Sequence, residues 1–462
     1  MSLLDTLLGN LPEVRGPPHK HTPFKEKMKW TLVVLVLFFV MGFVPLFGLG
    51  ENALQQFEFL SIILGASFGS IISLGIGPIV TASIVLQLLK GTGLLTFDLT
   101  KPEGKQRYQG LQKLLSIFFI VFEGAVYVLM GGLAPSASLA GTALFKEYQL
   151  LLIIQLVIGG VLIMFMDEVI SKWGMGSGIS LFIAAGVAQQ IFITAFNFLP
   201  SPTNQDIAAG AIPALFQSLS VGDATTAGLQ LAAIISTVLV FFIAVYGQAM
   251  KVEIPLSFGR VRGFSMRWPL NFFYTSNIPV ILIAALLANV QLFATLFERW
   301  GFPILGKFSG TTPISGFVYW LQSPDVVQNI IKGSFSSDMI VQTVVYVLVF
   351  VVGSVVFSIF WMQTAGMDAA SQAKQIIDSG LQIPGFRRDE RVLEHVLNRY
   401  IWPLTIVGGA AVGLLAALAD LTGALSRGTG ILLMVMIIYK LYEQIAKENM
   451  MDVHPALKKF MG

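Results

Sequence analysis

Residues 59–89 read FLSIILGASFGSIISLGIGPIVTASIVLQLL, a run of 31 residues without a charged side chain. As one helix at 1.5 Å per residue it would be about 46 Å long, whereas the hydrocarbon core of a bilayer is about 30 Å thick. Its first two thirds contain Gly65, Gly69, Gly75 and Gly77, and then comes Pro78, which suits the first turn of a helix. We therefore expect a short apolar helix, a break, and a membrane helix that begins near Gly75 and runs to Lys90. Non-helical backbone at membrane depth is tolerated only inside protein or beside a water-filled cavity, so the break is a candidate functional element.

The composition is that of a polytopic membrane protein. Of 462 residues, 55% are hydrophobic and 12% charged, and the mean hydropathy is +0.76, whereas soluble domains carry about 25% charged residues. The absence of cysteine excludes disulfides, thiol chemistry and thiolate metal sites, and leaves the redox compartment open. The first apolar run has 21 residues, follows five basic residues and lacks an A-x-A-like cleavage site, so we expect it to be retained.

Ten long apolar runs predict ten membrane crossings. They are Trp30–Gly50, Phe59–Leu89, Leu114–Phe145 (interrupted only by Glu123), Tyr148–Met166, Trp173–Gln205, Ala224–Met250, Trp268–Phe297, Met339–Met367, Tyr400–Ala419 and Gly428–Tyr439. The last run is short, but Asp420 and Lys440 near its ends can snorkel. Ahead of the crossings, residues 2–11 place leucines on one helical face behind Ser2 and Asp5. This pattern fits an interfacial helix or, alternatively, a mobile terminus.

The distribution of basic residues supports this count and orients the chain. With an even number of crossings both termini lie on one side, and that side holds 24 of the 29 Lys and Arg residues. Because basic residues are concentrated in cytoplasmic loops, we expect both termini to be cytoplasmic. The external loops Leu199–Asp223 and Glu298–Asp338 are poor in charge and are expected to cap the outer face.

Two cytoplasmic loops are too long to be simple connections. Residues 251–268 have β-branched and aromatic residues around Gly259 and Gly263, which predicts a hairpin with Arg260 and Arg262 near its tip. Residues 368–399 contain a turn at Pro384-Gly385, the arginines Arg387, Arg388 and Arg391, and a helix opened by Asp389. The basic charge by itself is explained by the general excess of Lys and Arg in cytoplasmic loops. The length favours a docking surface for a polyanion such as ribosomal RNA, or for an acidic partner.

The crossings divide into an N-terminal half, residues 1–223, and a C-terminal half, residues 224–462. In each half the second crossing has an early proline, in Gly75-Ile-Gly-Pro78 and Ser276-Asn-Ile-Pro279. Because each half contains five spans, the halves are expected to be inverted repeats that meet at the membrane centre. The fold class predicted is therefore all-α, with ten helices in two inverted halves.

Several segments, taken in order, resemble the SecY family in its archaeal and eukaryotic form. They are Gly75-Ile-Gly-Pro-Ile-Val-Thr-Ala82, Gly174-Met-Gly-Ser-Gly-Ile-Ser180, Tyr274-Thr-Ser-Asn-Ile-Pro279, Pro384-Gly385-Phe-Arg387 and Gly428-Thr-Gly-Ile-Leu-Leu433. The resemblance covers nearly the whole chain. It implies the central pore-forming subunit of a protein-conducting channel, with an hourglass pore that translocates secretory polypeptides and releases transmembrane segments sideways into lipid.

The resemblance also implies a constricting ring of aliphatic residues in the pore: Ile76, Val80, Ile179, Ile183, Ile281 and Leu433. An apolar ring can exclude water and ions when closed and offers a passing polypeptide no charge to bind. Packing in an ordinary bundle core is the alternative for each of them. The i, i+4 pairs Ile76/Val80 and Ile179/Ile183 are compatible with both interpretations.

A plug and a lateral gate are implied as well. The plug is expected at about residues 57–70, with Phe59, Leu60, Ile62, Ile63, Leu64 and Gly65; a permanently packed re-entrant segment is the alternative. The gate would be lined by Thr81, Glu123 and Asn289. Glu123 is the ionisable residue well inside an otherwise uncharged span, which makes it a functional candidate. A purely structural hydrogen-bonding carboxyl is the alternative.

The implied partners are SecE-like (gamma) and beta subunits with one span each, a ribosome or other driving motor that engages Arg387, the translocated polypeptide with its signal sequence, and the lipid of the cytoplasmic membrane. No cofactor or metal is expected. The chain has no G-x-x-x-x-G-K-[ST] phosphate loop, and its four histidines form no metal-ligand pattern. A secondary transporter is the main alternative, because inverted repeats and broken helices occur there too. A membrane enzyme is disfavoured because no paired acid, base or metal set is evident.

Overall fold

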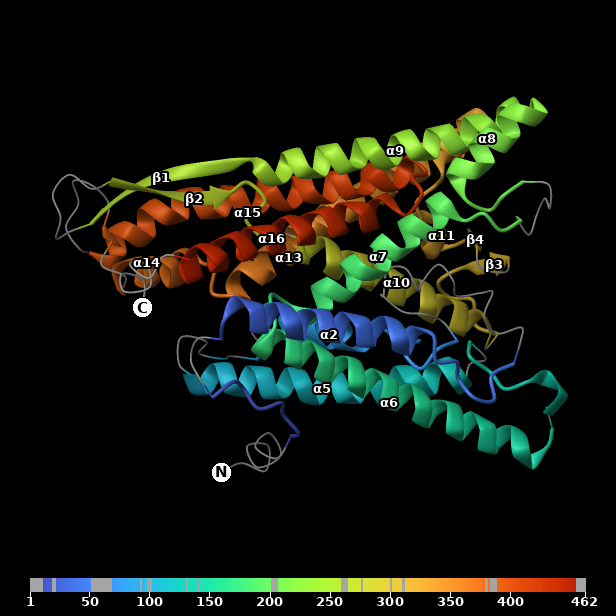
Figure 1. The fold of residues 1–462 in the computed structure, drawn as a ribbon, viewed down its shortest axis with the longest axis horizontal. Coiled ribbons are helices and arrows are strands. Elements are labelled where there is room, and N and C mark those ends of the chain that lie inside the picture. Colours follow the sequence, from blue (N-terminus) through green and yellow to red (C-terminus); the bar gives the residue numbers. More distant parts are fainter. Residues whose placement is uncertain are drawn as a thin grey trace.

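The long helices lie side by side along one axis, with short strands and helices at both ends of the bundle (Figure 1). The computed structural model describes residues 11–18, 22–50, 69–91, 94–95, 97, 102–129, 132–139, 141–200, 207–258, 265–275, 277–299, 301–309, 312–378, 381–382 and 389–453.

Ten described helices match the ten predicted crossings. Eight are long and apolar enough to span a membrane: α5 (Pro102–Leu129), α6 (Ala143–Trp173), α7 (Gly178–Phe196), α9 (Ala224–Ala249), α10 (Ile278–Arg299), α13 (Ser337–Thr364), α15 (Glu390–Leu421) and α16 (Gly428–Val453). The other two are α2 (Phe24–Gly42), which corresponds to the first crossing, and α4 (Gly77–Gly91), which corresponds to the second. The fold is therefore that of a helical polytopic membrane protein.

The break predicted in the second crossing is present. Residues 71–76 form successive turns and α4 begins at Gly77, so Pro78 lies in the first helical turn, where its missing N–H is not needed. Gly75 has a φ of +55°, a conformation that costs glycine little because it has no Cβ. In the other half, Pro279 is likewise the second residue of α10. The two halves thus share this local feature.

One end of the bundle, called the α14 end here, carries a three-stranded sheet. Strand β1 (Lys251–Phe258) pairs antiparallel with β2 (Ser265–Asn271) and with β5 (Leu381–Gln382), and α14 (Ala369–Asp378) lies beside them. This is the predicted hairpin, whose tip lies outside the described residues. Trp268, predicted to begin a crossing, belongs to β2. An uncharged run does not separate strand from helix, and α14 has no long apolar run that would predict it.

The opposite end, called the α8 end, contains more structure than the predicted caps. Its elements are η2 (Ala137–Leu139), α8 (Ala211–Val221), β3 (Lys307–Ser309), β4 (Thr312–Ser315), α11 (Phe317–Leu321) and α12 (Val326–Ile331). Gln342 of α13 donates to the carbonyls of Tyr319 at 2.8 Å and Gln322 at 3.1 Å, which holds α11 against α13. Elements this short bury too little surface to have a clear sequence signature.

Helix α15 joins two segments that the sequence interpretation separated. Asp389 is its N-cap, as predicted, and accepts a hydrogen bond from the N–H of Arg391 at 3.0 Å. Leu393 and Leu397 of this helix are buried. The helix then continues through Pro403 for 32 residues in all. The charged residues of its first turns end the apolar run, but they do not end the helix, because they lie mainly on its exposed face.

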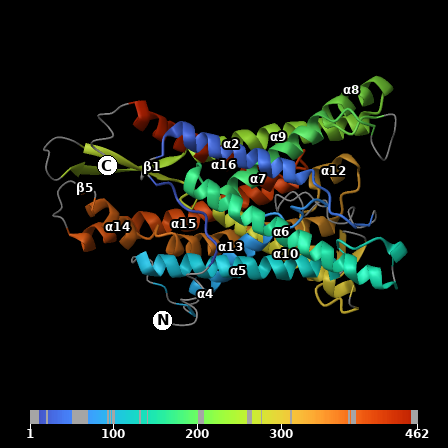
Figure 2. The same ribbon diagram turned by 60° about the horizontal axis from the view of Figure 1, so that its bottom comes forward.

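Helices of the two halves occupy different sides of the molecule. In Figure 1, α2, α5 and α6 lie on one side and α9, α15 and α16 on the other, with α7 and α10 between them. After a 60° turn, α7 of the N-terminal half is seen beside α16 of the C-terminal half, with which it is in contact (Figure 2). One connected apolar core includes residues from both halves.

Candidate functional site

The three predicted gate residues form one hydrogen-bonded cluster. Asn289 Nδ2 on α10 donates to Thr81 Oγ1 on α4 at 3.0 Å. The single hydroxyl proton of Thr81 faces two acceptors, Glu123 Oε1 on α5 at 3.0 Å and the carbonyl of Gly77 at 2.9 Å. Glu123 is buried, 4% exposed. The cluster therefore connects α4 and α5 of the N-terminal half to α10 of the C-terminal half.

Further contacts join the halves around this cluster and elsewhere. Helix α4 contacts both α10 and α13, and Lys90 Nζ of α4 donates to the carbonyl of Gln363 at 3.1 Å. Helices α2 and α7 contact α16, where Lys27 and Glu448 form an ion pair of 2.7 Å. Apolar side chains of α4, α10 and α13 belong to one connected core. The hydrogen bonds Asn289–Thr81 and Lys90–Gln363 are polar links among these helices.

The six predicted ring residues all lie in, or packed against, the connected apolar core. Five of them are buried: Ile76, Val80, Ile183, Ile281 and Leu433. Ile179 is partly buried. Ile76 stands one residue before α4, and its carbonyl accepts the N–H of Val80 at 3.1 Å, so this pair shares the first turn of the helix. Burial in a common core agrees with both a closed ring and ordinary packing, so the ring remains a prediction.

Two sets of predicted residues lie wholly or mostly outside the described part of the chain. One set is the predicted plug, with Phe59, Leu60, Ile62, Ile63, Leu64 and Gly65. The other is the set of docking arginines, of which these lie outside: Arg260, Arg262, Arg387 and Arg388. Of the docking set, Arg391 is described and lies exposed in the first turn of α15. At the end of the plug segment, the carbonyl of Gly69 accepts the N–H of Leu46 at 2.8 Å.

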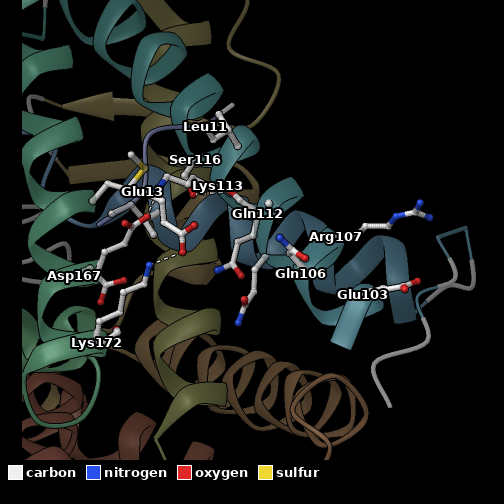
Figure 3. A pocket seen from close by; sticks show the side chains of 16 residues that line it. Leu11, Glu13, Glu103, Gln106, Arg107, Gln112, Lys113, Ser116, Asp167 and Lys172 are labelled. Carbon is white, nitrogen blue, oxygen red and sulfur yellow. Dashed lines mark hydrogen bonds and ion pairs between the residues drawn. The ribbon is translucent and has the colours of Figure 1, made fainter. Parts of the chain in front are cut away.

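A polar cavity of about 630 Å³ between α5 and α6 was not anticipated. Figure 3 shows Lys113 of α5 and Lys172 of α6 among its lining side chains, together with Glu13 of the N-terminal segment. Lys113 pairs with Glu168 and Lys172 pairs with Glu13. The hydrogen bond from Lys172 lowers the pKa of Glu13. The Lys172–Glu13 pair holds the N-terminal segment on α6, and Lys113 also donates to the carbonyl of Pro12, which holds the segment on α5. Charges just beyond the ends of the apolar runs were the available signal.

A second buried polar cluster joins α13, α15 and α16 near the α8 end. Asp420 is 7% exposed. Its carboxyl accepts hydrogen bonds from Tyr346 Oη at 2.6 Å, from the N–H of Thr429 at 2.7 Å and from the hydroxyl of Thr429. The sequence predicts a snorkelling Asp420 at a helix end, because nothing in it places Tyr346 beside this carboxyl. In the structure it is an interior acceptor.

Comparisons with known proteins agree with this architecture. A family model described as SecY matches residues 70–442, and one described as the plug domain of Sec61p matches residues 36–69. The chain is 46% identical to protein translocase subunit SecY of Methanothermobacter thermautotrophicus, covering 99% of this chain and 98% of the relative. It is 42% identical to that of Methanocaldococcus jannaschii, covering 100% of both.

Solved structures give the same result. A structure described as that of a protein conducting channel superposes with a TM-score of 0.83 at 41% identity, covering 98% of this chain and 99% of the other. Sec61 in the canine ribosome-channel complex from the endoplasmic reticulum superposes with a TM-score of 0.80 at 39% identity over the same shares. Fold and site thus define a multi-pass helical membrane protein whose two halves meet at a buried polar cluster. The chain belongs to the SecY family.

Proposed function

We propose that this chain is the pore-forming subunit of a channel that carries polypeptides across a membrane and releases transmembrane segments sideways into lipid. One observation carries the proposal: the SecY and plug-domain family models together match residues 36–442 without a gap. The chain thus has the counterpart of a whole channel subunit, including the region that corresponds to the plug. The plug itself we propose at residues 57–70.

The six aliphatic residues listed above are proposed to form the pore constriction. Their positions on α7, α10, α16 and the start of α4 support the proposal, since α7 contacts α16 and α10 contacts both α4 and α16. A ring assembled from four helices can widen by small helix displacements without unfolding any helix. Its aliphatic side chains offer a passing chain no fixed charge.

The lateral gate is proposed where α4 and α5 meet α10 and α13. The hydrogen bond from Asn289 to Thr81 supports this, because it crosses between the halves and would break when they separate. Such a bond contributes about 1 kcal/mol net, enough to favour the closed state without locking it. A permanent structural contact would instead persist in every state.

The α14 end is proposed to face the cytoplasm of a cell whose cytoplasmic membrane holds the channel. It carries β1, β2 and the exposed Arg391, in keeping with the excess of basic residues expected on that side. We propose that Arg260, Arg262, Arg387, Arg388 and Arg391 dock a ribosome through its RNA. SecE-like and beta subunits are the proposed membrane partners, and their copurification with a tagged chain is the first check.

The central test is crosslinking of a polypeptide arrested during translocation. The chain lacks cysteine, so Ile76→Cys or Ile281→Cys introduces one unique thiol at the proposed constriction. We expect a thiol-reactive crosslinker at either position to capture the arrested polypeptide. Ile235→Cys is the matched control, because Ile235 lies on the outward face of α9 and is 55% exposed.

Equal capture at the α9 position, or no capture at the two ring positions while translocation proceeds, would contradict a pore at this place. Saturable uptake of a small solute by the chain reconstituted alone would support the transporter alternative instead.

A further inference from the structure

Asp420 acts as the helix cap of α16 although it belongs to α15. The first N–H groups of a helix have no intrahelical acceptor and are usually satisfied by a neighbouring side chain. Here Asp420 Oδ1 accepts the N–H of Thr429, the second residue of α16, at 2.7 Å, and Asp420 also accepts the Thr429 hydroxyl. These hydrogen bonds therefore fix the position of the first turn of α16 in the direction of the α15 axis.

Gly428 fixes the same helix start laterally. A Cβ on Gly428 would collide with the backbone of Ala419, one residue before Asp420, so α15 and α16 are in direct backbone contact there. Tyr346 adds α13 to the arrangement through its 2.6 Å hydrogen bond to Asp420 Oδ2. Arg427, the residue before α16, lies close enough to interact electrostatically with Asp420, Tyr346 and Asp325. Three helices of the C-terminal half thus meet at one carboxyl.

The start of α16 lies one turn from the proposed ring. Leu433 follows Thr429 by four residues and therefore lies on the same face, one turn further along the helix. Between them, a Cβ on Gly430 would come within 3.3 Å of Val187 on α7, four residues after the ring residue Ile183. Because a helix is stiff over one turn, an axial or rotational error at Thr429 moves Leu433 by nearly the same amount.

We propose that Asp420 is a positioning residue for the pore constriction: it fixes where α16 begins and thereby sets the depth of Leu433. The membership of Leu433 in a constriction rests on the proposed function. The role of Asp420 in setting the position of Leu433 is independent of that function, so the two statements can be tested separately.

The test measures the position of Leu433 directly. Leu433→Cys gives the chain its only thiol, and the full-length protein, purified in its membrane complex and reconstituted into vesicles, is exposed to a membrane-impermeant maleimide on either side. Leu433 is 5% exposed, so slow labelling is expected in the parent. With Asp420→Ala added, we expect labelling to accelerate about tenfold or more, as a local loosening of α16 exposes the residue.

Two controls separate positioning from general damage. Asp223→Ala removes another aspartate cap, at the start of α9, which carries no ring residue; labelling of Leu433→Cys should stay at the parent rate. Ala417→Cys, on α15 and fully buried, reports unfolding and should stay unlabelled beside Asp420→Ala. Asp420→Asn keeps one oxygen for the Thr429 N–H, so Leu433→Cys should again be labelled nearly as slowly as in the parent. If the alanine variant does not fold, the asparagine variant takes its place in the labelling comparison.

Unchanged labelling of Leu433→Cys beside Asp420→Ala would overturn the proposal. So would equal acceleration at Ala417→Cys, which would mean that Asp420 only stabilises the fold. Ion permeability of the same vesicles then tests the proposed function separately. If labelling accelerates but permeability does not rise, Asp420 still positions Leu433, and the ring is not the seal.

Discussion

The clusters at Thr81 and at Asp420 are both buried and polar, but they join helices in different ways. At Thr81 one hydrogen bond of 3.0 Å, from Asn289, links the cluster to the other half. At Asp420 three hydrogen bonds converge on one carboxyl, and all of the helices involved belong to the C-terminal half. A carboxyl with several donors is costly to disrupt, whereas a neutral bond at a mostly apolar contact is not. The molecule is therefore held firmly within this half and loosely between α4 and α10.

The largest expected effect comes from breaking the contact between α15 and α16 within the C-terminal half. Gly428→Ala places a methyl group against the backbone of Ala419, which cannot move without displacing α15. We expect a loss of about 3 kcal/mol in the free energy of unfolding, at the upper end for overpacking. Unfolding of the purified complex by a denaturing detergent measures it.

Gly228→Ala is the matched control for that substitution. It also adds a methyl group to a helical glycine, but the nearest atom, on Ile331, is 3.8 Å from the new Cβ, an ordinary contact. Alanine is the better helix former, so stability should be kept or slightly improved. If the two variants unfold alike, the close contact of α15 with α16 is not the constraint described here.

The link between the halves is tested by Thr81→Val. The substitution leaves Asn289 and Glu123 without their shared hydroxyl, at a cost to the closed arrangement of about 1–2 kcal/mol, or roughly tenfold in the ratio of open to closed molecules. Ion permeability of vesicles that contain the resting complex should rise accordingly. Thr343→Val is the control, since the Thr343 hydroxyl bonds to the carbonyl of Met339 in its own helix. Equal permeability in both variants would argue against a latch at Thr81.

A double-mutant cycle sharpens this result. Asn289→Leu and Thr81→Val each remove the bond between α10 and α4, so their effects on permeability should be less than additive, with a coupling energy of about 0.5–1 kcal/mol. Additive effects would mean that the two residues act through different contacts.

The smallest effect is expected at the half-buried cap Asp223, which contrasts with buried Asp420. Hydrogen bonds from Thr226 and Thr225 lower the pKa of Asp223 to about 2, below its ordinary value of 3.8. Because the folded-state pKa is the lower one, the carboxylate stabilises the fold above pH 3.8, and that contribution is lost as the pH falls towards 2. Comparing Asp223→Asn with the parent in thermal unfolding at pH 7 and at pH 2 should show a small gap that closes at low pH. A gap that stays constant would exclude titration of Asp223 as its cause.

The sequence was sufficient for the crossings, because apolar length is a property of the chain alone. It also predicted the break before Pro78, the hairpin after Lys251 and the cap at Asp389. The three gate candidates proved to be hydrogen-bonded to one another. By contrast, Asp420 and Tyr346 are 74 residues apart in sequence, and their contact depends on how α13 packs on α15. Short elements such as α8 and α12 were also missed, because their stability comes from the helices on which they rest.

Mechanically, α15 is a stiff helix with one position of reduced bending stiffness. Its 32 residues extend about 48 Å at 1.5 Å per residue, from the exposed Arg391 to the interior Asp420. Pro403 removes one hydrogen bond between these two ends and lowers the resistance to bending there. A sideways load on the first turns of α15 is therefore absorbed largely at Pro403, while a push along the axis is transmitted to Asp420.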